Sequence, residues 1–191
     1  MALTWLTEEE QQRLLQLARA SIAQGLRHGR ALPVDLDTQP AAFAKLTASF
    51  VTLTLHGVLR GCMGCLEAVR PLAQDVAENA YRAAFRDPRF APLSEQEFAE
   101  IHVHISLLTP AEPMLVADEA DLLRQLRPGV DGLILEYGAR RATFLPSVWE
   151  QLPQAREFVR HLKMKAGLAA DFWDKGMRVW RYAAEEIGEG E

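Results

Sequence analysis

Residues 50–65 read FVTLTLHGVLRGCMGC, and this stretch decides the predicted fold. Residues 50–55 form an alternating run rich in β-branched side chains, which is typical of a strand with one buried face. His56-Gly57 is able to reverse the chain, so residues 58–60 are expected to form the second arm of a hairpin. The hairpin would then deliver the glycine-cysteine segment that follows it.

The segment Leu59–Cys65 combines a cation, two thiols and two glycines. We expect a strand end that opens into a tight turn, where Gly61 and Gly64 take left-handed backbone angles or approach a ligand. Backbone amides in such a turn can point at an anion. The alternative is a plain connection between a strand and a helix, in which the thiols are small apolar filler.

The spacing of Cys62 and Cys65 admits three interpretations. Two cysteines in a chain of this length indicate thiols in a reducing compartment rather than a disulfide framework. A closed zinc site needs about four ligands, so no metal site is predicted. A redox pair resembling thioredoxin would need the first cysteine at a helix N-terminus, whereas the helical pattern begins only at Pro71.

Composition restricts the classes of function. The 191 residues suffice for one core or for two lobes, and the formal charge of −5 gives no basic surface for a nucleic acid. The first residues lack the pattern of a signal peptide, and no apolar run reaches the length of a membrane span. We therefore expect a soluble, cytoplasmic protein with neither a nucleic-acid nor a membrane partner.

Helix and strand patterns surround the hairpin on both sides. Thr7 and Glu10 form a capping-box signature that begins a helix predicted to end near His28. Further helices are predicted at 71–86, 94–100, 118–126, 146–152 and 154–166, and further strands at 101–108, 133–137, 142–145 and 177–183.

Other candidate site residues are scattered along the chain. Two prolines make residues 87–92 an ordered turn that presents Asp87 and Arg89, which could equally be an ion pair that finishes a helix. His102 and His104 share one strand face, where they could bind a metal, act as a base or simply face solvent. Lys165 ends a helix, where a cation also complements the helix dipole.

Several separated motifs resemble the AmmeMemoRadiSam system protein A family, whose domain is also called the AMMECR-one domain. The resemblance covers nearly the whole chain, here assigned as one domain over 7–187 with a tail at 188–191. The matching segments are Phe50–Leu53, Leu59–Gly64, Asp87–Phe90 with Pro92, Ile105-Ser106 with Leu108, Phe144–Pro146 with Val148, and Lys165–Leu168.

The resemblance implies an α+β fold, with mainly antiparallel sheet flanked by helices, in a larger and a smaller lobe with a cleft between them near the cysteine motif. It implies no defined reaction and no particular cofactor. Two positions depart from the family pattern. Cys65 stands where no cysteine is called for, and His104 stands where an acidic residue is expected, so their roles would be particular to this chain.

Three hypotheses of function follow. In the first, the protein is an enzyme or enzyme component in which Cys62 is a nucleophile or thiolate contact. Its anionic substrate would be bound by Arg60, Gly61, Gly64, Arg89 and Lys165, with His104 and Asp87 as accessory groups. In the second, it is a non-catalytic adaptor that acts with Memo-like and radical SAM proteins. In the third, and weakest, Cys62 and Cys65 form a redox pair.

Overall fold

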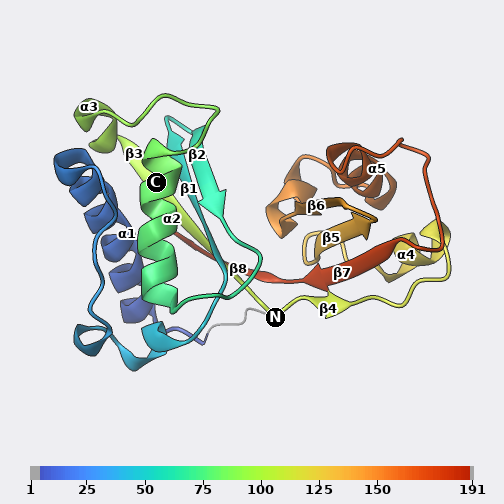
Figure 1. Cartoon of the computed structure of the whole chain (residues 1–191), viewed down its shortest axis with the longest axis horizontal. Coiled ribbons are helices and arrows are strands. Elements are labelled where there is room, and N and C mark those ends of the chain that lie inside the picture. The colour runs from blue at the N-terminus through green and yellow to red at the C-terminus, as the bar shows by residue number, and fades with distance from the viewer. Residues whose placement is uncertain (1–4, 190–191) are drawn as a thin grey trace. The chain divides into compact units, whose positions relative to one another are not determined.

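The computed structural model describes residues 5–189, which form two compact units (Figure 1). Of the described residues, the first unit comprises 5–108 with 185–189, and the second comprises Thr109–Ala184. Each unit contains its own antiparallel sheet and its own helices. The predicted α+β class, with antiparallel sheets flanked by helices, is therefore confirmed.

The first unit packs two long helices on one face of a sheet with strand order β2-β1-β3-β8 (Figure 1). Its strands are β1 (Ser49–Leu55), β2 (Val58–Gly64), β3 (Ile101–Leu108) and β8 (Ala184–Gly188). Its helices are α1 (Glu8–His28), α2 (Leu72–Phe85) and the short α3 (Glu95–Phe98), with 3₁₀ turns η1 (Leu36–Thr38) and η2 (Ala41–Ala44).

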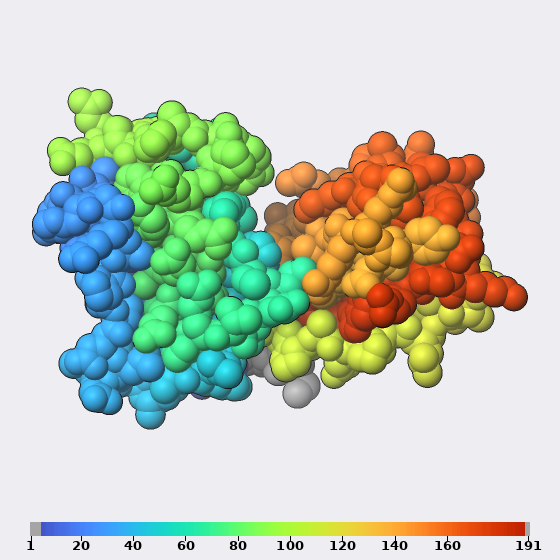
Figure 2. Space-filling model, viewed as in Figure 1, coloured from blue at the N-terminus to red at the C-terminus, as the bar shows by residue number. Residues whose placement is uncertain are grey.

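The capping box predicted for the first helix is present. The Thr7 hydroxyl accepts a hydrogen bond from the Glu10 amide, and the Glu10 carboxylate accepts one from the Thr7 amide at 2.8 Å. At the other end, Gly29 takes a left-handed φ of 66° that closes the helix. The apolar stripe of α1 packs into the core, and Figure 2 shows α1 in blue beside α2 in green on the surface of this unit.

The two faces of this sheet differ in burial. Val51 and Leu53 on β1, with Val103 and Ile105 on β3, are completely buried in the core that the helices cover. Strand alternation places Thr52 and His104 on the opposite face, where both are half-buried. Polar side chains of the hairpin and of β3 therefore share the face away from α1 and α2.

The glycine-cysteine segment is a strand rather than the expected turn. β2 continues through Gly64, and neither Gly61 nor Gly64 has a positive φ. Within this hairpin, the residues with a left-handed backbone are His56 (φ 51°) and Gly57 (φ 75°), which form the predicted turn. The pairing shifts between Leu53 and Thr54, so that Arg60 is the extra residue of a bulge.

The second unit packs a sheet of order β4-β7-β5-β6 against α4 and α5. Its elements are β4 (Glu112–Pro113), α4 (Glu119–Gln125), β5 (Gly132–Tyr137), β6 (Arg140–Phe144), η3 (Pro146–Glu150), α5 (Ala155–Lys165) and β7 (Arg178–Tyr182). Trp149 stacks on the buried Phe158 with 3.9 Å between the ring centroids, which joins η3 to α5 in the core.

Two short strands, β4 and β8, were not predicted from the sequence. β4 has only two residues, too few for an alternating pattern. β8 is separated from β7 by Ala183 alone. Its pattern is obscured because Glu185, an acidic residue, is buried together with Ile187. Gly188 and Glu189 were assigned to a tail. Gly188 is the last residue of β8, and Glu189 forms an ion pair with Arg19. Residues 190–191 lie outside the described range.

Candidate functional site

Cys62 lies in the middle of β2, directly opposite Thr52 of β1. The Thr52 hydroxyl donates a hydrogen bond to the Cys62 sulfur at 3.2 Å. The backbone amide of Cys62 does not pair with β1 but donates to the Asp87 carboxylate at 2.9 Å. The half-buried thiol is therefore fixed through both its side chain and its backbone.

Asp87 directly follows Arg86, the C-cap residue of α2, and is 5% exposed. Besides the Cys62 amide, its carboxylate accepts hydrogen bonds from the Arg89 amide at 3.1 Å and from Arg89 Nε and Nη2 at 3.0 and 2.7 Å. These bonds, that of the Arg89 side chain first, hold the pKa of Asp87 well below its usual range. Asp87 is thus an ionised carboxylate that joins the turn to β2.

Arg89 faces solvent although Asp87 does not. Its side chain is 55% exposed, against 2% for that of Asp87. The pKa of Arg89 is raised, chiefly by its hydrogen bond and charge interaction with Asp87 and further by the nearby Cys62 sulfur. The structure therefore brings Cys62 of the glycine-cysteine segment together with Asp87 and Arg89 of the predicted turn.

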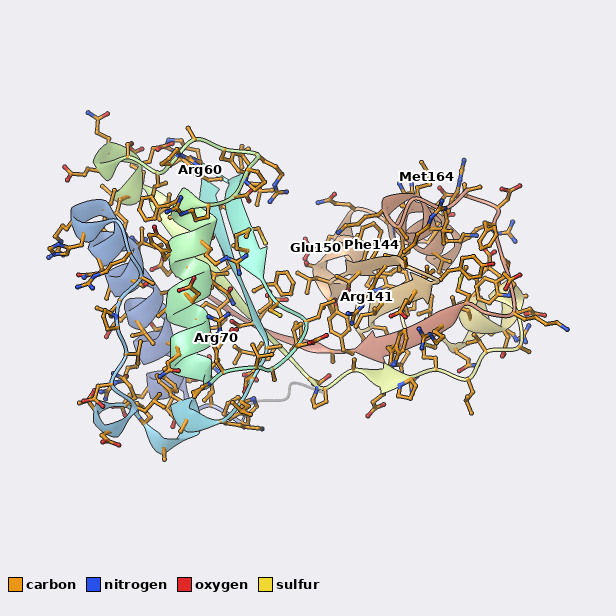
Figure 3. The ribbon with its side chains drawn as sticks, viewed as in Figure 1. Arg60, Arg70, Arg141, Phe144, Glu150 and Met164 are labelled. Carbon is orange, nitrogen blue, oxygen red and sulfur yellow. The ribbon has the colours of Figure 1, made fainter. Side chains whose placement is uncertain are left out.

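Arg60 takes part in a separate set of contacts, beside α3 (Figure 3). Its Nε and Nη2 donate to the two carboxylate oxygens of Glu97 at 2.7 and 3.0 Å, and Nη2 also donates to the Ala91 carbonyl. This fork lowers the pKa of Glu97 to about 2. The ring of Phe90 lies near both arginines, with its centre 5.7 Å from the Arg60 guanidinium and 5.4 Å from that of Arg89.

The two glycines of the motif serve packing between elements. A Cβ on Gly61 would lie 2.1 Å from the Ala83 carbonyl oxygen of α2, and one on Gly64 would lie 2.3 Å from the Phe50 ring. Such approaches leave no room for a side chain. The need for glycine therefore arises from the helix and from β1, and not from the left-handed turn that was expected.

His104 lies beside the Cys62 cluster, and Lys165 belongs to the other unit. The register places Thr52 between Cys62 and His104, and the His104 ring packs against Gly188, whose Cβ would lie 2.8 Å from Nδ1. Lys165 belongs to the second unit, where its ammonium group donates to the Thr143 carbonyl at 3.0 Å and lies 5.1 Å from the Phe144 ring centre.

The structure also bears on the second cysteine and on the possibility of a metal site. Neither cysteine forms a disulfide, and the Cys65 sulfur accepts a hydrogen bond from the Glu67 amide at 3.4 Å. Within residues 5–189, no three His, Cys, Asp or Glu side chains are grouped as a metal site would require. No helix in that range is both long and apolar enough to cross a membrane.

Comparison with known proteins assigns the family. Residues 15–187 match the AMMECR1 family. The chain belongs to the AMMECR1 family. A protein of Methanothermobacter thermautotrophicus is 41% identical over 190 residues, covering 96% of both chains, and one of Methanocaldococcus jannaschii is 35% identical over 194 residues, covering 97% of this chain and 93% of its own.

A solved structure agrees with the AMMECR1 assignment. The crystal structure of an uncharacterized protein from Pyrococcus horikoshii matches with a TM-score of 0.89 and 32% sequence identity. The match covers 96% of this chain and 93% of that one. The suspected family and the α+β fold class are therefore both confirmed.

Three residues of this AMMECR1 chain contact Cys62, Arg60 or Arg89 but were not predicted as site residues. Thr52 was assigned only to a strand, although its place opposite Cys62 depends on a bulge that the sequence does not reveal. Glu97 falls within the helix predicted at 94–100 and closes its capping box, since its carboxylate accepts from the Ser94 amide at 2.9 Å. Phe90 stood in a recognised motif and carried no chemical signal of its own.

Proposed function

We propose that this AMMECR1-family protein binds a small anionic substrate at the cluster of Cys62, Asp87 and Arg89, with Cys62 as its nucleophile or thiolate contact. The observation that carries the proposal is the Asp87 carboxylate, which holds the Cys62 backbone and the Arg89 guanidinium at the same time. A cation is thereby kept close to a positioned thiol. Nearby cations and hydrogen-bond donors are what a reactive thiolate requires.

The direction of the charges supports binding of an anion. Asp87 is buried, whereas Arg89 is more than half exposed, so the part of the ion pair that meets solvent is positive. Arg89 uses Nε and Nη2 for Asp87, and its Nη1 has no hydrogen-bond partner among residues 5–189. That donor is available to a carboxylate or phosphate group.

Alkylation with a charged and a neutral reagent tests this proposal. Iodoacetate and iodoacetamide attack the same thiol, so their rate ratio reports the attraction of an anion to it. The ratio is measured on Cys65→Ser, which retains Cys62, and on Cys62→Ser, which retains Cys65. We expect a ratio several-fold higher at Cys62, and a fall at Cys62 when Arg89→Ala is added.

Arg86→Ala is the matched control, because it removes one cation three residues earlier, where Arg86 lies over Tyr81 instead. Equal ratios at the two thiols, or an equal effect of Arg86→Ala and Arg89→Ala, would contradict the proposal. A Cys62 that reacts with neither reagent in the folded protein would also rule out a role for its thiol.

A second candidate function is an adaptor that acts with Memo-like and radical SAM proteins. The observation in its favour is the exposed apolar pair at the hairpin, where Val58 is 67% and Leu59 is 40% exposed. Exposed apolar groups of this kind are typical of contact surfaces. Co-purification with both proteins that is lost in Val58→Ser with Leu59→Ser, but retained in Cys62→Ser, would favour the adaptor over the enzyme.

A further inference from the structure

The second unit has a hollow of about 540 Å³ that takes no part in the function proposed above. One wall is the β5–β6 turn, residues 137–140, and the other is the chain that follows α5, including Leu168, Ala169 and Phe172. Leu168 ends one of the motifs that carried the family resemblance. The volume is in the range of pockets that hold small ligands.

We propose that this hollow is a binding site for a small planar aromatic molecule that bears one anionic group. Tyr137 from one wall and Phe172 from the other contact each other, with ring centroids 4.9 Å apart and the planes at 62°. Both rings also pack against the core of this unit, which fixes their orientation. Two rings set at an angle can stack on one face of a flat ligand and contact its edge.

Arg140 supplies the cation. Its Nη1 donates to the Gly167 carbonyl at 2.6 Å, which ties the guanidinium across the hollow from β6 to the chain after α5. Its Nε and Nη2 have no partner among the described residues, so they can bind a carboxylate or phosphate. An arginine already anchored by one bond loses less side-chain freedom when it binds a ligand.

Two glycines shape the walls of the hollow. Gly138 has a φ of 59° at the first position of the two-residue β5–β6 loop, as a type II′ turn requires. Gly167 has a φ of 77° and ends α5. These angles turn both chains sharply at the rim, so that Arg140 and the Gly167 carbonyl meet.

The test is a titration of the full chain, followed by amide chemical shifts in two-dimensional NMR. The probe is indole-3-carboxylate, compared with its neutral carboxamide and with cyclohexanecarboxylate, which is an anion without an aromatic ring. Phenyl phosphate distinguishes phosphate from carboxylate as the preferred anion. We expect indole-3-carboxylate or phenyl phosphate to shift the amides of residues 137–140 and 168–172, and the other two compounds to bind at least several-fold more weakly.

Variants separate the two parts of the site. Arg140→Ala should weaken binding of the aromatic anion about 10-fold or more, because a charged hydrogen bond is lost. Phe172→Leu should weaken the aromatic anion but not cyclohexanecarboxylate. Arg156→Ala, which removes an exposed arginine of α5, should leave affinity unchanged. Arg140→Lys keeps the charge and provides a second variant if Arg140→Ala unfolds.

Several results would overturn the proposal. They are the absence of shifts at millimolar probe, shifts confined to other parts of the chain, equal affinity for the carboxamide, and equal losses in Arg140→Ala and Arg156→Ala. None of these measurements involves Cys62, so failure here is distinct from failure of the proposed thiol site.

Discussion

Asp87 in the first unit and Asp131 in the second hold an arginine in nearly the same way. Asp87 accepts from Arg89 Nε and Nη2 at 3.0 and 2.7 Å, and Asp131 accepts from Arg127 Nε and Nη2 at 3.0 and 2.6 Å. Both carboxylates are buried, and both arginine side chains are slightly more than half exposed. The bond lengths are almost the same, although Asp87 presents both carboxylate oxygens to the Arg89 side chain, whereas Asp131 presents Oδ1 alone to that of Arg127.

Each carboxylate also accepts the backbone amide of its own arginine, and the main difference is that Asp87 has one further partner. Asp131 accepts the backbone amide of Arg127 itself at 2.8 Å, so all its bonds close one local turn. Asp87 accepts the amide of Cys62, which is 25 residues away on a strand. A buried ion pair is therefore a local fastening in one unit, whereas in the other it links a turn to the strand that carries the thiol.

Removal of each carboxylate should have the largest effect. Asp87→Ala and Asp131→Ala should each lower the free energy of unfolding by about 2–4 kcal/mol, because buried amides and an arginine lose their acceptor. Urea denaturation measures both. Only Asp87→Ala should also change the rate of Cys62 alkylation, and a change of similar size in Asp131→Ala would mean that the two aspartates do not differ as described.

Removal of each arginine should cost less. Arg89→Ala and Arg127→Ala should each lower the free energy of unfolding by about 1–2 kcal/mol, since water reaches both guanidinium groups and weakens the pairs. The backbone bonds to each aspartate persist in these variants. Thermal unfolding measures the loss, and a loss above that of the matching Asp→Ala variant would contradict the assigned roles.

Acid should reveal the Asp87 link directly. The pKa of Asp87 is lowered in the folded protein from an ordinary value of 3.8, so its contribution to stability is complete above that value and is lost as pH falls through the lowered pKa. Wild-type stability should therefore decline below pH 3.8, and Asp87→Asn should show a shallower decline. Exposed Glu95→Gln serves as control. Parallel acid profiles for wild type and Asp87→Asn would refute this assignment.

The bond from Thr52 to the thiol should have the smallest effect. Thr52→Val should lower the free energy of unfolding by about 0.5–1 kcal/mol and slow alkylation of Cys62 near neutral pH, since a donor to the thiolate is lost. Thr54→Val, on the same face of β1, is the control. Unchanged alkylation in Thr52→Val would show that the hydroxyl does not act on the sulfur.

Local signals in the sequence predicted much of this fold. The capping box of Thr7 and Glu10 and the turn at His56-Gly57 depend only on neighbouring residues, and both are present as expected. The prediction of a turn at Gly61 and Gly64 was wrong. A glycine can be required because its backbone takes a left-handed angle or because neighbouring atoms leave no room for a side chain, and the sequence does not distinguish the two. Here the lack of space comes from Ala83 and Phe50, which the sequence does not place beside them.

The candidate site could be predicted only in part, for the same reason. The proximity of Asp87 and Arg89 follows from their separation of two residues, and Cys62 stood out by its chemistry. The bond that unites them depends on where the end of α2 meets β2, which is a tertiary feature. Arg60 was also expected beside Cys62 at the site, and its contacts depend on tertiary structure too. It is close to Cys62 in the sequence, but its side chain is bound to Glu97 of α3.

The position of β2 in its sheet gives the Asp87 bond a further consequence. β2 is the outermost strand in the order β2-β1-β3-β8, so its outer backbone groups could pair with a strand from another molecule. Asp87 occupies the amide of Cys62 on that side and places a buried negative charge against it. The carboxylate that positions the thiol therefore also occupies a backbone donor through which this edge of the sheet could otherwise pair with another strand.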